Sequence, residues 1–347
     1  MAALRRRDFL RTAGALAGTA LARTLGVPAG AAEVPVPRRP FGTTGEEVSI
    51  LGVGGHAIGL AKSEDEAIRI VRDALDAGVT FMDNAWEYHG GRSEEWMGKA
   101  LEGRRDRAFL MTKVCTHGRA SHVAMAQLEE SLRRLRTDHV DLWQIHEVIY
   151  DNDPDLHFMK GGAVEALAEA KRQGKTRFVG FTGHKDPSIH RKMLAHDFPF
   201  DACQLPLNVF DARFRSFEQE ILPELNRRGI APIGMKSLGG TGAAVADGIV
   251  TVDEALRYVL SLPIATLVSG IDSLTVLRQN LAIASLFTPM PPARQEALRV
   301  RSARWAGDGR YELYKTSMRF DGAPGREQHG FPPPPGEPGG RRGAPSR

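Results

Sequence analysis

The chain has 347 residues, of which 42% are hydrophobic and 25% are charged, the ordinary composition of a globular protein with one large domain or two small ones. The formal net charge of +4 arises in residues 1–31, which contain five arginines and a single acid, Asp8. In the rest of the chain basic and acidic side chains balance, so the charge gives no support for binding to nucleic acid.

The N-terminus has the three parts of a bacterial signal peptide. The pair Arg6-Arg7 precedes a short apolar run at 12–22, and a small-residue site of the A-x-A type ends at Ala31. The arginine pair, followed by Asp-Phe-Leu, resembles a twin-arginine signal, whose export machinery carries folded proteins, often with a cofactor in place. We therefore expect residues 1–31 to be a signal peptide and the protein to be periplasmic or secreted; an amphipathic N-terminal helix is the alternative.

The two cysteines, Cys115 and Cys203, do not form a CxxC pair or a metal-binding cluster. Each lies in or beside an apolar run, so buried thiols are expected. A disulfide between them would need the fold to bring them close together, which we do not expect.

The segment after the leader alternates between two hydrophobic patterns. An extended linker at 33–40 and a hairpin at 41–55 lead into short β-branched runs, and stretches of helical period such as 64–77 and 122–136 separate them. Strands are expected at 48–54, 79–83, 108–114, 139–145, 176–182, 201–205, 230–236 and 265–270. Eight strand–helix units in about 235 residues predict a closed (β/α)8 TIM barrel with an N-terminal hairpin.

Two further observations complete the domain prediction. No G-x-G-x-x-G follows the first strand, which weakens the alternative of an open dinucleotide-binding sheet. The alternation stops near residue 287, and the Pro-, Gly- and Arg-rich residues 323–347 are predicted to be disordered. We therefore expect the barrel domain to span residues 38–322.

Four ionisable residues follow three neighbouring strands, at the barrel end where active sites form. Asp83 ends the second strand, Tyr88 lies in the loop after it, Lys113 is near the end of the third, and His146 ends the fourth. An ammonium group lowers the pKa of a nearby phenol, a carboxylate keeps that ammonium charged, and a histidine can hydrogen-bond a substrate oxygen. Singly, each residue has an ordinary structural role, but together they suit protonation of an oxygen while a hydride reaches carbon.

The same segments resemble the aldo-keto reductase family. The likeness lies in 81-FMDNAWEYHGGRSEEWMGKAL-101, in 111-MTKV-114, in 141-DLWQIHE-147 and in the opening 42-GTTGEEVSILGVGG-55, and it extends from about residue 38 to 285. This resemblance implies a metal-free barrel that uses NADPH, or less often NADH, to reduce aldehydes and ketones to alcohols.

The resemblance also implies roles for the four residues. Tyr88 would be the general acid, and Lys113 would lower the pKa of Tyr88. Asp83 would anchor Lys113, and His146 would orient the carbonyl. For the cofactor, it implies contacts from Gly55, Asp83, Thr182, Gln204, Met235, Lys236, Leu238, Gly240, Gly270, Asp272, Gln279 and Asn280.

The expected cofactor site departs from the family pattern at several positions. Gly183 stands where the family often has Asn beside the carboxamide, His184 stands where an apolar residue is commoner, and Met235 replaces a stacking aromatic ring. Lys236 and the glycines after it would meet the pyrophosphate. The adenosine end departs in a similar way.

At that end, Gly270 and Val276 occupy positions where NADPH-specific members place basic residues. Asp272 would repel a 2′-phosphate, although Arg278 could compensate. We expect NADP by family resemblance, with NAD as the alternative.

Aromatic side chains suggest the substrate pocket. The candidates are His56, Trp86 and Tyr150, together with the C-terminal segment around Trp305, Tyr311 and Tyr314. The insertion at 147–162 is interpreted either as a lid or as a plain surface loop. The sequence predicts a small carbonyl substrate without identifying it, and we expect a monomer.

Two other functions are weighed against a reductase. One is a non-catalytic nucleotide-binding redox sensor or a subunit of a cell-envelope complex, favoured by the departures in the cofactor site. The other is a metal-dependent hydrolase that uses His56, His146 and His184, which lacks the carboxylate and the His-x-His spacing of such sites.

Overall fold

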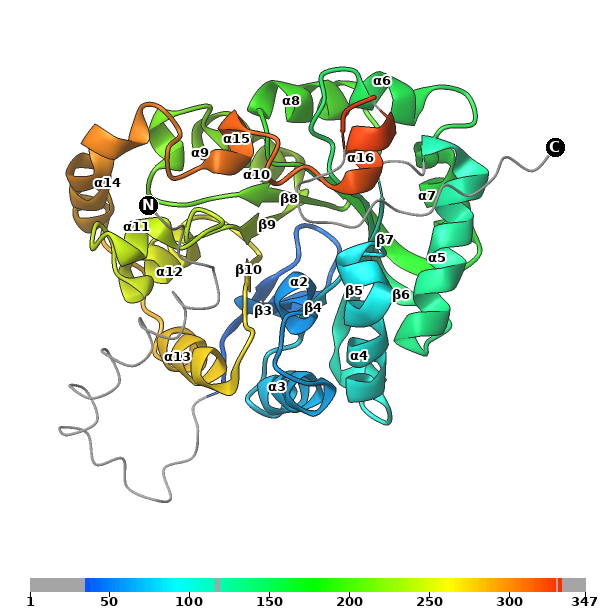
Figure 1. Ribbon diagram of the computed structural model, residues 1–347, viewed down its shortest axis with the longest axis horizontal. Coiled ribbons are helices and arrows are strands. Elements are labelled where there is room, and N and C mark those ends of the chain that lie inside the picture. Colours follow the sequence, from blue (N-terminus) through cyan, green and yellow to red (C-terminus); the bar gives the residue numbers. More distant parts are fainter. Residues whose placement is uncertain (1–34, 116–118, 329, 333–347) are drawn as a thin grey trace.

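The computed structural model describes residues 35–115, 119–328 and 330–332, so the predicted signal peptide and residues 333–347 lie outside the described residues. Eight parallel strands close into a barrel in the order β10-β3-β4-β5-β6-β7-β8-β9 (Figure 1). The predicted fold class is confirmed, and each of the eight expected strands forms. Their bounds are β3 (Leu51–Gly54), β4 (Phe81–Asp83), β5 (Phe109–Val114), β6 (Val140–Ile145), β7 (Thr176–Thr182), β8 (Ala202–Pro206), β9 (Ala231–Met235) and β10 (Thr266–Ser269).

The strands read as continuous apolar runs because helices cover their outer face while side chains fill the interior. All six residues of β5 and all six of β6 are buried. The register pairs Lys113 with Gln144 and Thr182 with Gln204. Polar residues near the strand ends are therefore brought to the same rim of the barrel.

A short hairpin covers the opposite end. Strand β1 (Arg38–Pro40) pairs antiparallel with β2 (Glu47–Ser49), so the expected linker ends in a strand because its last residues pair with β2. Between these strands Phe41 is fully buried, and its ring lies 4.8 Å from that of Phe109. The hairpin thus closes the amino-terminal end of the barrel with an aromatic cluster.

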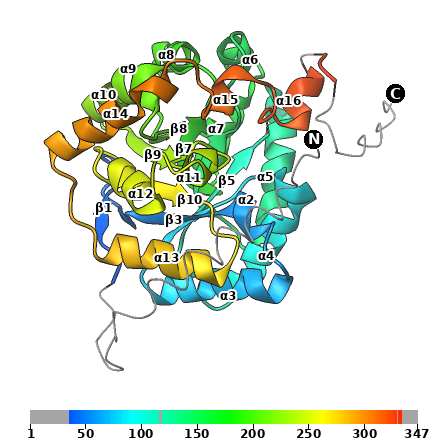
Figure 2. The same ribbon diagram turned by 60° about the vertical axis from the view of Figure 1, so that its left-hand side comes forward.

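The helices wrap the barrel (Figure 2). Helix α3 shows the local cause: the Ser63 side chain accepts a hydrogen bond from the backbone of Glu66, and Ala67, Ile70 and Val71 face the strands. The α-helices up to the C-terminal segment are α2 (Gly55–Ile58), α3 (Glu64–Asp76), α4 (Arg92–Leu101), α5 (Ser121–Leu135), α6 (Asp153–Phe158), α7 (Ala163–Arg172), α8 (Pro187–Ala195), α9 (Phe217–Glu220), α10 (Leu222–Arg228), α11 (Ala243–Ala246), α12 (Val252–Leu260) and α13 (Leu274–Ser285). Short 3₁₀ helices within the described residues include η1 (Tyr88–Gly91), η2 (Arg105–Arg107) and η4 (Asp211–Arg213).

The insertion at 147–162 is folded rather than a plain surface loop. It contains α6, whose fully buried Asp153 accepts hydrogen bonds from the backbone N–H groups of Ile149 and Tyr150, at 2.9 and 2.8 Å. These bonds fix the start of the insertion beside the barrel rim.

The C-terminal segment continues past the eighth unit with α14 (Pro292–Ala306), α15 (Leu313–Thr316) and α16 (Ala323–Gln328). Figure 1 shows it, in orange and red, returning across the end of the barrel toward α6. The prediction of disorder was wrong over 323–328, because the buried Arg326 donates hydrogen bonds to the carbonyls of Met318 and Pro332 and holds α16 in place. Among the described helices, none has both the length and the apolarity needed to cross a membrane.

Candidate active site

The four residues expected to carry the chemistry meet at the carboxyl-terminal rim of the barrel. The ammonium Nζ of Lys113 lies 2.5 Å from Asp83 Oδ1, 2.7 Å from the carbonyl of Asn84 and 3.3 Å from the hydroxyl of Tyr88. Asp83 and Lys113 are almost fully buried. A buried ammonium needs this many acceptors, because an unpaired charge in the interior is costly.

Two of the residues expected to contact the cofactor, Gly55 and Gln204, also reach Asp83. Its second oxygen, Oδ2, accepts a hydrogen bond from the backbone N–H of Gly55 at 3.4 Å, and Oδ1 accepts one from Gln204 Nε2 at 3.4 Å. A Cβ atom on residue 55 would lie 2.4 Å from the carbonyl oxygen of Asp83, so this approach requires glycine. The carboxylate is therefore fixed from β5, from β8 and from the start of α2.

The loop that carries Tyr88 is held in an unusual backbone conformation. His89, Gly90 and Gly91 all have positive φ angles, of 55°, 65° and 93°. Arg134 of α5 closes on this loop and donates a hydrogen bond to the carbonyl of Trp86 at 2.9 Å. A Cβ atom on Gly91 would lie 2.4 Å from the Arg134 guanidinium, so glycine allows the loop to seat.

Trp86 was expected in the substrate pocket, but its indole N–H donates a hydrogen bond to Glu130 of α5 at 2.8 Å. The Arg134 guanidinium lies 5.5 Å from the centre of its ring. The structure thus places Trp86 against α5, where it stabilises the Tyr88 loop. His56 lies closer to the chemistry, because its exposed ring meets the Tyr88 ring edge-on at 5.4 Å.

The pKa of Tyr88 is shifted in the direction opposite to the prediction. Burial raises it well above the ordinary value, and the negative charges of Asp83, Glu87 and Glu147 raise it further. The Lys113 ammonium lies 3.3 Å from the Tyr88 hydroxyl, but the net shift of the Tyr88 pKa is upward. The phenol therefore keeps its proton at neutral pH, in the form that can donate to an oxygen.

Two carboxylates near His146 were not singled out from the sequence. Glu87 Oε1 forms an ion pair with His146 Nδ1. Burial acts to raise the pKa of Glu87, but the charges of His146 and Lys113 outweigh it and bring that pKa below its ordinary value. Burial raises the pKa of Glu147 to about 7. The only available sequence signal was their position directly beside Tyr88 and His146.

The nicotinamide end of the expected site has features that fit a bound carboxamide. Thr182 and Gln204 are buried and paired in register on β7 and β8. Within the described part of the chain, Gln204 Oε1 has no hydrogen-bond donor, and an amide N–H of a cofactor would satisfy it. His184, beside them, is buried, and burial lowers its pKa well below the ordinary value.

The presence of glycine at position 183 has a steric explanation. A Cβ atom there would lie 2.2 Å from the carbonyl oxygen of Val148 and 2.8 Å from the ring of His190. The asparagine expected from the family resemblance therefore cannot fit this backbone. The backbone N–H of Val148 also donates to the carbonyl of Thr182 at 2.8 Å, which fixes the two segments together.

The loop expected to bind the pyrophosphate is packed against the C-terminal segment. Lys236 Nζ lies 5.6 Å from the ring centres of both Tyr314 and Phe320, and burial lowers its pKa to about 8. A Cβ atom on Gly239 would lie 2.3 Å from the carbonyl oxygen of Tyr311. Met235, Leu238 and Gly240, the other expected contacts in this region, are half-buried.

We call residues 311–322 the C-terminal strap. Asp321 of the strap forms an ion pair with Lys185 at 2.6 Å and accepts a hydrogen bond from the hydroxyl of Tyr150 at 3.1 Å. The backbone N–H of Gly322 donates to Glu147 Oε2 at 2.7 Å. Tyr150, an expected pocket residue, is thus an anchor of the strap.

A buried charge cluster fixes the other end of the strap. The fully buried Lys315 lies 2.6 Å from Asp211 Oδ1 and 2.8 Å from Glu312 Oε1. The hydroxyl of Tyr314 donates to Glu312 at 2.7 Å, and the ring is fully buried rather than lining an open pocket. Burial raises the pKa of Asp211 to about 7; the Lys315 ammonium acts to lower this pKa, and the Glu312 carboxylate raises it.

At the adenosine end of the expected site, some of the expected residues are accessible and one is buried. Gly270, Arg278 and Gln279 are exposed and Asp272 is half-buried, so this edge is accessible. Asn280 is buried, and its Nδ2 donates to Ser269 Oγ at 2.9 Å. One N–H of the Asn280 amide is therefore used within the barrel wall.

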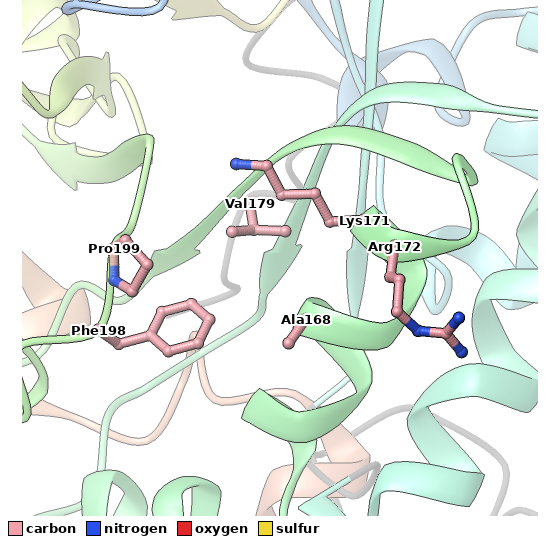
Figure 3. Close-up of a pocket in the computed structure, with 6 residues that line it drawn as sticks. All are labelled: Ala168, Lys171, Arg172, Val179, Phe198 and Pro199. Atoms are coloured by element: carbon pink, nitrogen blue, oxygen red, sulfur yellow. The ribbon is translucent and has the colours of Figure 1, made fainter.

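Other candidate features lie away from the four residues that meet at the rim, or do not group side chains as a site would require. Figure 3 shows a shallow hollow of about 290 Å³ on the outside of the barrel, lined by Ala168, Lys171, Arg172, Val179, Phe198 and Pro199. In residues 35–115, 119–328 and 330–332, no three His, Cys, Asp or Glu side chains are grouped so as to hold a metal ion. Cys115 and Cys203 are both buried, as expected.

A model of the Aldo/keto reductase family matches residues 50–247, which is more than half of the chain. The protein therefore belongs to the aldo/keto reductase family.

Similar proteins carry reductase names. The aldo-keto reductase YhdN of Bacillus subtilis (strain 168) is 32% identical over 195 residues, which cover 52% of this chain and 55% of YhdN, so the chain spans about half the length of that relative. The holo form of aldo-keto reductase AKR11C1 from Bacillus halodurans superposes with a TM-score of 0.65 at 24% identity, covering 77% of this chain and 96% of that chain. An aldo/keto reductase from Klebsiella pneumoniae in complex with NADP and acetate gives 0.63 at 22% identity, covering 80% and 96%. At these identities the two structures support the fold.

Proposed function

We propose that the protein reduces an aldehyde or ketone to an alcohol, reversibly, with a nicotinamide nucleotide as hydride donor. The observation that carries the proposal is the position of Lys113, whose Nζ contacts both Asp83 Oδ1 and the Tyr88 hydroxyl. The membership of the aldo/keto reductase family supports the same reaction.

In this proposal, four side chains of the protein have separate roles in the reaction. The bound nucleotide supplies the hydride. Tyr88 donates its proton to the carbonyl oxygen as negative charge develops there, and the Lys113 ammonium, 3.3 Å from that hydroxyl, stabilises the resulting phenolate. Asp83 fixes Lys113, and His146, whose ring meets that of Tyr88 edge-on at 5.6 Å, positions the carbonyl.

The proposal is tested with Tyr88→Phe. The variant removes only the hydroxyl, so we expect carbonyl reduction across an aldehyde panel to fall by at least about 10²-fold, with nucleotide affinity unchanged. Full activity in this variant would refute the mechanism. Fluorescence titration with NADPH provides the control for binding.

We propose NADP as the nucleotide, with NAD as the alternative. The similar reductase from Klebsiella pneumoniae is a complex with NADP, and Arg278 of this chain is an exposed base near the adenosine end. Gly270 and Asp272 give no positive charge there. Dissociation constants for NADPH and NADH decide the question, and tighter binding of NADH would reverse the assignment.

A non-catalytic nucleotide-binding module is the second candidate. The strap covers the Lys236–Gly240 loop, and the raised pKa of Tyr88 makes its phenol a weaker acid. This candidate predicts tight nucleotide binding with no turnover of any aldehyde or ketone. Titration followed by the same substrate panel separates the two functions.

We also propose export through the twin-arginine machinery. The support is the Arg6-Arg7 pair, the apolar run at 12–22 and the small-residue site ending at Ala31. Replacing both Arg6 and Arg7 with Lys should retain the full-length chain in the cytoplasm, as measured by cell fractionation. Equal periplasmic amounts of the variant and the wild type would exclude this route.

A further inference from the structure

Beside the proton-donating tyrosine, a second carboxylate faces the active-site histidine. Glu87 directly precedes Tyr88, and its Oε1 forms an ion pair with His146 Nδ1. Both side chains are mostly shielded, with 16% of Glu87 and 10% of His146 exposed. The contact is a charge pair when the imidazole is protonated.

The contact decides which forms of the imidazole are stable. A carboxylate at Nδ1 favours a hydrogen on that nitrogen. In a neutral ring Nε2 would then carry a lone pair, which cannot donate to a carbonyl oxygen. With a hydrogen kept on Nδ1, only the doubly protonated ring also has an N–H at Nε2, and a carboxylate beside an imidazole favours that charged ring.

We propose that Glu87 is a positioning residue that holds His146 through Nδ1 and keeps it in the imidazolium form, so that Nε2–H donates to the substrate oxygen. This inference deepens the proposed reduction and rests on it. It also gives the carbonyl two donors, the imidazolium and the Tyr88 hydroxyl, whose rings lie 5.6 Å apart.

Other ionisable groups surround the same ring. Glu147 follows His146 in the chain and adds negative charge, and His184 of the segment after β7 adds positive charge when protonated. Tyr88 packs edge-on against it, with Lys113 at 3.3 Å from the Tyr88 hydroxyl. Glu87 is the carboxylate in direct contact, so its removal has a larger effect than that of Glu147.

The first experiment measures the protonation of His146 directly. The nitrogen NMR shifts of His146, assigned with a His146→Gln variant, are followed against pH in the wild type and in Glu87→Gln. We expect the change from imidazolium to neutral imidazole to move to lower pH by about one unit or more in Glu87→Gln. Equal midpoints in the two proteins would overturn the proposal, whether or not the protein reduces carbonyls.

The second experiment measures how kcat of the full protein depends on pH. In the wild type the basic limb of the kcat profile should follow the same His146 transition, and in Glu87→Gln this limb should shift to lower pH with KM for NADPH unchanged. Glu95→Gln, an exposed carboxylate on α4, is the matched control and should leave the profile in place. An unshifted limb in an active Glu87→Gln enzyme would refute this inference while leaving the reductase function intact; an inactive wild type would refute the function instead.

Discussion

The buried pair of Asp83 and Lys113 allows a quantitative test of the site. Asp83→Asn keeps the shape of the side chain but leaves the Lys113 ammonium, 1% exposed, without its counter-ion. Removing one partner of a buried ion pair costs about 3–5 kcal/mol. A domain typically has about 5–15 kcal/mol of stability, so the variant should lose a large share of it. Urea unfolding, followed by the fluorescence of the four tryptophans, measures this loss.

Two further variants show whether the loss of stability in Asp83→Asn is caused by burial of the ion pair. Asp76 pairs with Arg104 and Arg107 on the surface, where its side chain is 55% exposed, and Asp76→Asn should cost less than about 1 kcal/mol. Adding Lys113→Met to Asp83→Asn removes the stranded charge and should restore much of the stability. A loss in Asp83→Asn as small as that in Asp76→Asn, or a double variant no more stable than the single one, would refute this reasoning.

Three other predictions concern the rim. Gly183→Asn, which restores the family residue, should lower the melting temperature and the affinity for nucleotide, because its Cβ would lie 2.2 Å from the carbonyl of Val148; a stabilised variant contradicts the steric account. Because the pKa of Glu147 is raised from 4.5 to about 7 in the fold, the contribution of this one carboxyl to stability is fully present below about pH 4.5 and is lost as pH rises to 7. Thermal melts should therefore show a smaller fall between pH 4.5 and 7 in Glu147→Gln than in the wild type, and equal falls contradict this prediction. Asp321→Asn should weaken the bond to Lys185 and speed proteolysis of the strap, whereas an unchanged cleavage rate would show that this anchor is dispensable.

Much of the fold follows from local pattern. The helical period at 64–77 and 122–136 predicted α3 and α5 within one residue at each end, because caps and apolar faces are encoded in neighbouring residues. The four chemical residues were also predictable, since each follows a strand and parallel strands end at one rim. Their meeting is a direct consequence of the barrel topology.

The remaining parts depend on contacts between distant segments. The strap was not predicted because Asp321 meets Tyr150 across 171 positions and nothing local signals this pairing. The direction of the Tyr88 pKa shift was wrong for a related reason. The shift is set by burial and by the negative charges of Asp83, Glu87 and Glu147, and a single motif does not reveal that sum.

The strap also sets an order of assembly. Its contacts with Glu147 and Tyr150 join residues separated by 175 and 171 positions, so they cannot form until nearly the whole chain has been synthesised. Chains fold from the N-terminus as they emerge from the ribosome, and the barrel strands are complete at residue 269. The contacts of the strap with Lys236 can therefore form only after all the barrel strands have been synthesised.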